Sequence, residues 1–377
     1  MGELADGQVK AVSNEVIILD SLGDPFSPWS GGAQRYCYEI GRRLVLEGFE
    51  VTWLSNGFQG AARDEVVAGI RFIRHGSQYT SYIRSCLKLS SSHRDALIFE
   101  SISAIPFFTP ILARHRTLSM IHHIVPFATL ARKVGTFAPF VAGVQNVLSP
   151  LLYRKRPIIT NSRSTFDELR GQGYLDVQIV RLGVELPDPA MVAFDAKEKS
   201  VVMVGPLRPW KRIGHGLMAF ASLPKEWSLN VIGSFESDEY REELTYLADR
   251  LGIRGRTNFT GRISEGEKNE IYRKASVAIV TSEKEGWGLA AAEPQAYGCP
   301  VVGYDVPGIR DSVHNGKTGI LVRSGDVVAL SAALTHVTED PSRLRCLATN
   351  AHSLYRGYSW DEVFRDFFQI FTSQFRL

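Results

Sequence analysis

The chain is poor in cysteine, and the few cysteines that it has are scattered. They stand at positions 37, 86, 299 and 346, and no C-x-x-C pair occurs. Disulfide frameworks and structural zinc sites need closely or regularly spaced cysteines, so the pattern argues against both. We also recognise no secretory leader. These absences predict a reduced, cytoplasmic protein. With 44% hydrophobic and 22% charged residues, its composition is that of an ordinary globular chain.

Two ligand-binding motifs are missing as well. The chain has no D-x-D sequence and no His/Asp cluster with metal-ligand spacing, so we expect no bound metal ion. Its N-terminal glycine pair, Gly31-Gly32, does not extend to the G-x-G-x-x-G pattern that holds a dinucleotide. A dinucleotide-dependent oxidoreductase is therefore disfavoured.

Acidic residues are scarce in one part of the N-terminal half. Between Val66 and Phe166, thirteen cationic residues stand against two acidic ones, Asp95 and Glu100. Such a basic block predicts an anionic partner: a membrane surface, a phosphate-bearing acceptor or nucleic acid. Nucleic acid is the least favoured, because no binding module is recognisable. The cations are Arg71, Arg74, Arg84, Lys88, Arg94, Arg114, Arg116, Arg132, Lys133, Arg154, Lys155, Arg156 and Arg163.

The same block contains an uncharged stretch between basic flanks, from Val134 to Tyr153. Its twenty residues just reach the length of a bilayer span, but Pro139, Gly143 and Pro150 interrupt it. Three interpretations are open: a core or cleft-lining helix, an interfacial helix docked on a membrane and, least favoured, a transmembrane helix.

Apolar runs alternate with helical patterns along the chain. At 377 residues the chain exceeds what one core usually supports, so two domains are expected. A proline-bearing and then charged segment at 186–199 reads as the linker, and 358–371 predicts an amphipathic helix. The fold class is therefore α/β, with two Rossmann-like, doubly wound sheets. Buried strands are predicted at 16–20, 51–54, 97–99, 118–121, 158–160, 178–180, 201–204, 229–232, 277–280, 301–304 and 319–322.

The most informative segment is 282–302. Glu285 and Glu293 are separated by a loop that contains two glycines and by the start of an Ala-rich helix. Both carboxylates can therefore point into one cleft. Gly286 and Gly288 let backbone N–H groups approach a ligand closely, and the helix directs its positive end at an anion. Because carboxylates accept hydrogen bonds from sugar hydroxyls, the segment predicts a site for a polyhydroxylated ligand that carries phosphate.

These residues also carry a family resemblance. The pattern E-G-x-G-x-x-x-x-E-x-x-x-x-G-x-P-V-V resembles the signature of group-1 glycosyltransferases, the retaining family four with the GT-B fold. The segments 30–51, 160–169, 181–185 and 304–322 are similar to the same family. The resemblance implies two Rossmann-like domains that face each other across a cleft, with the C-terminal helix packing back on the first. We expect an acceptor-side domain at 1–186, completed by 357–377, and a nucleotide-sugar-binding domain at 187–356.

The resemblance implies roles for individual donor-side residues. Lys211 falls on the family lysine that neutralises the leaving diphosphate. Pro206 occupies the position of the family arginine, and Arg208, two residues on, is the candidate replacement. Glu285 matches the glutamate that contacts sugar hydroxyls near the reacting carbon, and Glu293 the one that binds the ribose. The other implied donor contacts are the backbone amides of Gly286, Trp287, Gly288 and Leu289, and Arg262 near the nucleobase.

In the first domain, Gly31 and Gly32 match the family loop whose backbone amide meets the phosphate. His122 aligns with a cleft histidine that hydrogen-bonds the donor sugar or acceptor, and His123 is a weaker alternative. A proline after the second glutamate, Pro294, is unusual; it requires the helix to begin close to Gly288, because proline is tolerated in a first helical turn.

The prediction is a retaining hexosyltransferase of polysaccharide or glycolipid biosynthesis. It would use a UDP- or GDP-sugar, a glycan or lipid-linked acceptor, and no metal or cofactor. It is expected in the cytoplasm, with peripheral association at an anionic membrane surface. The alternative is a catalytically silent nucleotide-sugar-binding protein, since Pro206 and Pro294 depart from the family pattern.

Overall fold

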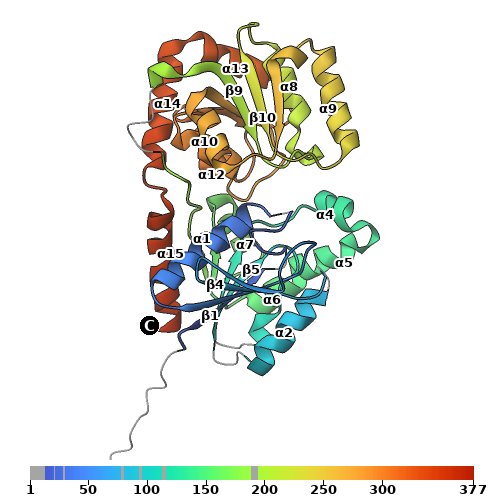
Figure 1. The fold of residues 1–377 in the computed structure, drawn as a ribbon, viewed down its shortest axis with the longest axis vertical. Coiled ribbons are helices and arrows are strands. Elements are labelled where there is room, and N and C mark those ends of the chain that lie inside the picture. The colour runs from blue at the N-terminus through green and yellow to red at the C-terminus, as the bar shows by residue number, and fades with distance from the viewer. Residues whose placement is uncertain are drawn as a thin grey trace, which may run out of the picture. The chain divides into compact units, whose positions relative to one another are not determined.

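The computed structural model describes residues 13–20, 22–28, 30–77, 80–92, 96–112, 116–187 and 194–377. These residues form two compact units, each built on its own sheet (Figure 1). The N-terminal unit comprises the described chain up to Thr160 together with Leu169–Gln178 and Phe364–Leu377. The C-terminal unit comprises Asn161–Glu168 and Ile179–Val363. The predicted α/β class with two largely parallel sheets is confirmed.

The division between the units differs from the predicted boundary at residue 186. Asn161–Glu168 and the chain from Ile179 group with the C-terminal unit, and the chain rejoins the N-terminal unit at Phe364. Val184 forms an isolated bridge with Ser359, which holds the segment before the linker in the C-terminal unit. Residues 188–193 of the predicted linker lie outside the described residues.

In the described residues, the N-terminal sheet has the order β3-β4-β2-β1-β5-β6-β7-β8, with β3 antiparallel to β4. β1, β5 and β6 are buried along nearly their whole length, as expected for parallel strands covered on both faces. The strands are β1 (Glu15–Asp20), β2 (Glu50–Ser55), β3 (Asp64–Val67), β4 (Ile70–Arg74), β5 (Leu97–Ile102), β6 (Thr117–Ile121), β7 (Ile158–Thr160) and β8 (Val177–Ile179).

The hairpin β3–β4 is not predicted by the sequence analysis. β3 carries two acidic residues and lies at the sheet edge, half exposed, so it lacks the apolar run of the central strands. Ala68 and Gly69 both have positive φ, 51° and 78°, and join the strands in a two-residue turn whose twist suits a hairpin. β4 thereby carries Arg74 into the interior of the unit.

The helix predicted at 358–371 corresponds to α15, and Phe364, Phe367, Phe371 and Phe375 on it are buried. On α15, Phe367 packs edge-on against Phe99 of the sheet, and Phe371 against Phe49, so the predicted return of the C-terminal helix is confirmed (Figure 1). The helices are α1 (Gly32–Leu46), α2 (Thr80–Ser92), α3 (Thr109–Leu112), α4 (Phe127–Val134), α5 (Ala138–Gly143), α6 (Ser149–Tyr153), α7 (Arg163–Gly171) and α15 (Trp360–Phe375), the last two divided between the units.

The uncharged stretch is helical in pieces. A 3-10 turn, Gly135–Phe137, precedes α5, and a π-helical turn, Val144–Leu148, connects α5 to α6. Its inner side is buried, with Val141 in a cluster with Val125 and Leu130. Within the described residues, no helix combines the length and apolarity needed to cross a bilayer.

The C-terminal sheet is parallel and has the order β11-β10-β9-β12-β13-β14 in the described residues. Only β11, a partly polar edge strand, was not predicted. The strands are β9 (Glu198–Val204), β10 (Ser228–Ile232), β11 (Thr257–Gly261), β12 (Ala275–Val280), β13 (Val301–Tyr304) and β14 (Gly319–Val322). The helices are α8 (Ile213–Ala221), α9 (Asp238–Arg250), α10 (Glu265–Lys274), α11 (Leu289–Ala296), α12 (Ile309–Ser312), α13 (Val327–Glu339) and α14 (Pro341–Tyr355), with 3-10 turns at Phe194–Ala196, Pro209–Lys211 and Arg254–Arg256.

Each sheet has one point where the strand order reverses. In the N-terminal sheet this point lies between β1 and β5, and in the C-terminal sheet between β9 and β12. Loops after two such strands run to opposite sides and leave a crevice at their carboxyl ends, which is where doubly wound sheets bind ligands. The loops after β9 and β12 carry Lys211 and Glu285, and Asp20 ends β1 beside Ser101 of β5.

Candidate functional site

Lys211 and Glu285 meet at the strand-order reversal of the C-terminal sheet. The Lys211 ammonium is paired with Oε1 of Glu285, and the Ser282 hydroxyl donates to the same oxygen at 2.6 Å. Both members of the pair are largely buried, at 17% and 16% side-chain exposure. The structure therefore brings together the two donor-side residues to which the sequence analysis assigns catalytic roles.

Hydrogen bonds to backbone carbonyls join the two loops that carry this pair. The Thr281 hydroxyl donates to the carbonyls of Lys211 and Arg212, at 2.8 and 3.0 Å. The Glu283 amide donates to the Trp210 carbonyl at 2.9 Å. These contacts fix the turn after β9 against the loop after β12, so the ammonium is held in place before any ligand arrives.

The glycine-broken loop ends at the N-terminus of α11. Gly288 is the N-terminal cap in the left-handed region, with φ 87° and ψ 61°, and an added Cβ would lie 2.7 Å from Ile309. The first N–H groups of α11, beginning with Leu289, have no partner within the helix and carry its positive dipole end. Trp287 is buried and its ring stacks on Tyr358 at 5.8 Å, so this side chain packs inside the unit.

Glu293 lies on α11 and is held by two residues that the sequence analysis missed. Its Oε2 accepts from the Lys268 ammonium at 2.9 Å and from the Tyr272 hydroxyl at 3.0 Å. Burial alone would lower the pKa of Lys268, but the carboxylates of Glu293 and Glu265 outweigh it and the pKa is raised. The helical spacing of Glu265, Lys268 and Tyr272 on α10 is the signal that could have revealed this cluster.

Pro294 departs from the prediction made for it. Helix α11 begins at Leu289, which confirms the start near Gly288, but Pro294 is its sixth residue and lies beyond the first turn. Proline has no N–H, so the bond to the carbonyl four residues earlier is missing. The helix tolerates this because it ends two residues later, and the Pro294 carbonyl accepts from the amides of Tyr297 and Cys299 at 3.0 and 2.9 Å.

Two further donor contacts implied by the resemblance are not members of the Lys211–Glu285 pair. The Arg208 guanidinium lies over the Trp210 ring, 5.3 Å from its centroid, on the same turn as Lys211. Arg262 is exposed in the loop after the edge strand β11, and β10 and β9 separate that strand from β12. Their roles stay predictions.

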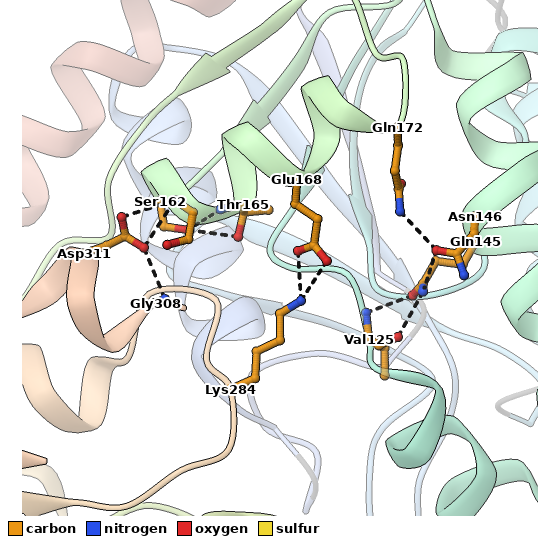
Figure 2. Close-up of polar contacts among 11 residues, drawn as sticks. Val125, Gln145, Asn146, Ser162, Thr165, Glu168, Gln172, Lys284, Gly308 and Asp311 are labelled. Atoms are coloured by element: carbon orange, nitrogen blue, oxygen red, sulfur yellow. Dashed lines mark hydrogen bonds and ion pairs between the residues drawn. The ribbon is translucent and has the colours of Figure 1, made fainter. Parts of the chain in front are cut away.

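The loop that carries Glu285 is braced from the side by α7 and by the loop after β13. Lys284 donates to both carboxylate oxygens of Glu168 at 2.9 and 2.8 Å (Figure 2). The Asp311 carboxylate accepts from the Gly308 amide at 3.1 Å (Figure 2). It also accepts from the Ser164 amide at 3.2 Å. Glu285 is thus positioned by several contacts that its own motif does not contain.

In the N-terminal unit, the glycine loop is organised around a buried carboxyl group. The Gln34 amide donates to both oxygens of Asp20 at 3.0 and 3.1 Å, and its oxygen accepts from the Gly31 amide at 3.0 Å. Burial raises the pKa of Asp20 to about 6, against the bonds from the Leu22 amide and Gln34. Gly32 is the first residue of α1. The Gly31 amide, assigned to phosphate by the resemblance, is already bonded within the protein.

His122 follows β6 and is buried. Its Nε2 lies 3.4 Å from the Ser101 hydroxyl, and its ring packs edge-on against Tyr36 at 6.0 Å. Burial, with a contribution from His123, lowers the pKa of His122 to about 3. Burial therefore favours the neutral form of the imidazole.

The predicted basic block is partly neutralised inside the protein. Arg74 is buried and pairs with Asp24 and Glu65, and Arg71 pairs with Asp64 at 2.6 Å. Arg74 therefore does not form part of a basic surface, which corrects the count made from the sequence, whereas Arg71 is exposed. Arg94 and Arg114 lie outside the described residues. Among the residues that the structure does describe, no group of three or more His, Cys, Asp and Glu side chains gathers as a metal site would require.

Part of the C-terminal unit is similar in sequence to a known protein family. Residues 188–353 match the family of group 1 glycosyl transferases. A D-inositol 3-phosphate glycosyltransferase of Thermomonospora curvata is 36% identical over 131 residues, 35% of this chain and 30% of that protein. One from Rhodococcus jostii is 32% identical over 195 residues, 50% of this chain and 43% of that protein. The matches thus span less than half the length of these relatives. A glycogen synthase of Mycobacterium tuberculosis is 24% identical over 370 residues, 88% of this chain and 89% of that protein.

Solved structures match over nearly the whole chain. Sucrose-phosphate synthase from Thermosynechococcus elongatus superposes with a TM-score of 0.80 at 20% identity, covering 96% of this chain and 99% of that one. Anabaena HepE in complex with UDP-glucose superposes with a TM-score of 0.73 at 16% identity, covering 95% and 99%. The fold is that of the GT-B glycosyltransferases. Residues 188–353 are similar in sequence to the group 1 glycosyl transferases.

Proposed function

We propose that this protein transfers a sugar from a nucleotide-sugar donor to an acceptor. One observation carries the proposal: within the family-matched domain, the Lys211–Glu285 pair lies beside the N-terminus of α11, where the strand order reverses between β9 and β12. A fixed ammonium and a helix N-terminus stabilise a bound diphosphate. They stabilise most strongly the negative charge that develops on the diphosphate as it leaves the sugar. Carboxylates beside them accept hydrogen bonds from hydroxyl groups, as a sugar and a ribose require.

Each residue of the site is proposed for a role that its chemistry allows. Lys211 and the first amides of α11 would stabilise the leaving diphosphate, and Glu285 would orient the sugar through its hydroxyls. Glu293, already held by Lys268 and Tyr272, would bind the ribose. Retention of the anomeric configuration is part of the proposal and rests on the resemblance to the retaining family. Proton NMR of the first product formed distinguishes retention from inversion.

The acceptor side is proposed from the N-terminal unit. Its basic residues suit a glycan or lipid-linked acceptor that bears phosphate. The proposed reaction is the transfer of a hexose to this acceptor in the cytoplasm. The competing function, silent binding of a nucleotide sugar, is favoured by Pro206 and Pro294, which depart from the family pattern.

A donor panel tests the function. UDP-, GDP- and ADP-sugars are each added to the purified protein, and the melting temperature and the release of nucleoside diphosphate are measured. We expect one nucleotide class to raise the melting temperature and also to be turned over, by hydrolysis or by transfer. The HepE complex with UDP-glucose makes that donor the first to try. Stabilisation without turnover, with any acceptor offered, would favour the silent binder.

Glycosyl transfer should not depend on a divalent metal. The positive charge that a metal would supply comes instead from Lys211 and the N-terminus of α11, so initial rates after treatment with EDTA should equal those of the untreated enzyme. The measurement is the initial rate before EDTA, after it, and after adding Mn²⁺ or Mg²⁺. Full loss of activity that either ion restores would refute the assignment.

A further inference from the structure

The segment from α4 to α6 presents apolar side chains to solvent. Phe137, Phe140, Val147 and Leu151 are each between 60% and 71% exposed. All four lie on the consecutive 3-10, α and π-helical turns between residues 137 and 151, and we call these four residues the outer face. Large apolar side chains that are exposed together on one short segment are typical of an interaction surface.

The orientation of this segment is fixed by its opposite side. Gln145 lies in the π-helical turn and is buried; its side-chain oxygen accepts from the Val125 amide and its amide donates to the Val125 carbonyl, both at 3.0 Å (Figure 2). Asn146 accepts from Gln172 at 3.1 Å. The uncharged stretch is therefore docked on the N-terminal unit through one face, and turning the outer face inward would break these bonds.

Basic residues flank the outer face at both ends. Arg132 and Lys133 are exposed at the end of α4, and Arg154 and Lys155 are exposed just after α6. No Asp or Glu occurs in the sequence from 101 to 166. An apolar centre between cationic ends is the arrangement of a helix that lies in the interface of an anionic bilayer.

We infer that the outer face of α4–α6, with its basic flanks, docks this protein on the surface of an anionic lipid membrane. Aromatic and aliphatic side chains enter the boundary between headgroups and acyl chains, while the four cations contact anionic headgroups. Of the three interpretations of the uncharged stretch, this proposal takes the interfacial one, for a segment with one buried face and one apolar exposed face. Docking needs no sugar donor, so its test is independent of the proposed transfer reaction.

Vesicle co-sedimentation of the whole chain tests the inference. We expect the protein to sediment with phosphatidylcholine vesicles that contain phosphatidylglycerol, and not with phosphatidylcholine alone. The double variant Phe137→Ser/Phe140→Ser should lower the binding constant on the order of tenfold or more, because it removes two large apolar anchors. Tyr246→Ser/Val328→Ser is the matched control, since these two side chains are also exposed but lie in the C-terminal unit, and its binding should equal that of the wild type.

The electrostatic contribution is tested in the same assay. Arg154→Glu/Lys155→Glu should weaken binding to the anionic vesicles and reduce its dependence on salt, whereas Lys225→Glu/Lys317→Glu, with the same change in charge, should not. Equal binding to both kinds of vesicle, binding to neither, or wild-type binding by the Phe137/Phe140 variant would overturn the inference. A dimer in light scattering that this variant dissociates would also overturn it, because a second copy would then cover the outer face.

Discussion

Replacing Lys211 by alanine should lower the turnover number for glycosyl transfer by about 10²–10³-fold, with a smaller effect on donor KM. The reason is that a fixed charge aimed at the leaving group stabilises the transition state more than the ground state, and removing one such preorganised group costs about 3–4 kcal/mol of barrier. In the structure, Thr281 and Glu283 hold the turn of Lys211 in place, so alanine should remove the ammonium without moving the backbone. Initial rates over a range of donor concentrations give both constants.

A matched control is Lys199→Ala. Lys199 also pairs with a glutamate, Glu226, at 3.2 Å, but that pair is exposed, with 62% and 53% side-chain exposure. Exposed pairs contribute about 0–1 kcal/mol to stability, so this variant should keep its turnover and its melting temperature. Unchanged turnover in Lys211→Ala would refute the assignment of Lys211. Equal losses in both variants would show that the effect comes from a general loss of lysine charge.

The meeting of Lys211 and Glu285 could be predicted from the sequence, because each residue follows a strand that the apolar pattern reveals. Parallel strands end at the same edge of a sheet, and the structure supplies the neighbour relation of β9 and β12. The contacts of Glu293 could not be predicted in this way. They depend on how α10 packs beside α11, a tertiary relation that no local pattern contains.

Charge counting illustrates the same limit. The sequence assigned Arg74 to a basic surface, but its guanidinium is buried and paired with Asp24, fifty positions away in the chain. That pairing exists because β4, in the β3–β4 hairpin that the sequence analysis did not predict, brings Arg74 against the loop that contains Asp24. The uncharged stretch gave three interpretations for a related reason, since hydropathy cannot tell which face of a helix is covered until partners such as Gln145 and Val125 are placed.

Replacing Gly308 by alanine should lower glycosyl transfer about 10²-fold by moving Glu285. An added Cβ at Gly308 would lie 2.3 Å from the Glu285 carbonyl oxygen and 2.9 Å from its Cβ, so the loop after β12 must shift. The Glu285 amide is also bonded to the Pro307 carbonyl at 3.1 Å, which couples the two loops directly. A displacement of about 1 Å at a residue that orients a substrate is enough for a loss of this size.

Gly316→Ala is the control that distinguishes displacement of Glu285 from the effect of backbone strain alone. Gly316 has φ 76°, close to the 83° of Gly308, but an added Cβ there would meet nothing within 4 Å. Both variants should therefore lose about 1–3 kcal/mol of unfolding free energy from the strained conformation, measured by urea denaturation. Gly308→Ala should lose more, because its Cβ also overlaps the Glu285 carbonyl. Only Gly308→Ala should lose activity, because only its Cβ collides with the loop that carries Glu285. If Gly316→Ala lost as much activity at the same stability, general strain would explain both variants and the coupling of Gly308 to Glu285 would be refuted.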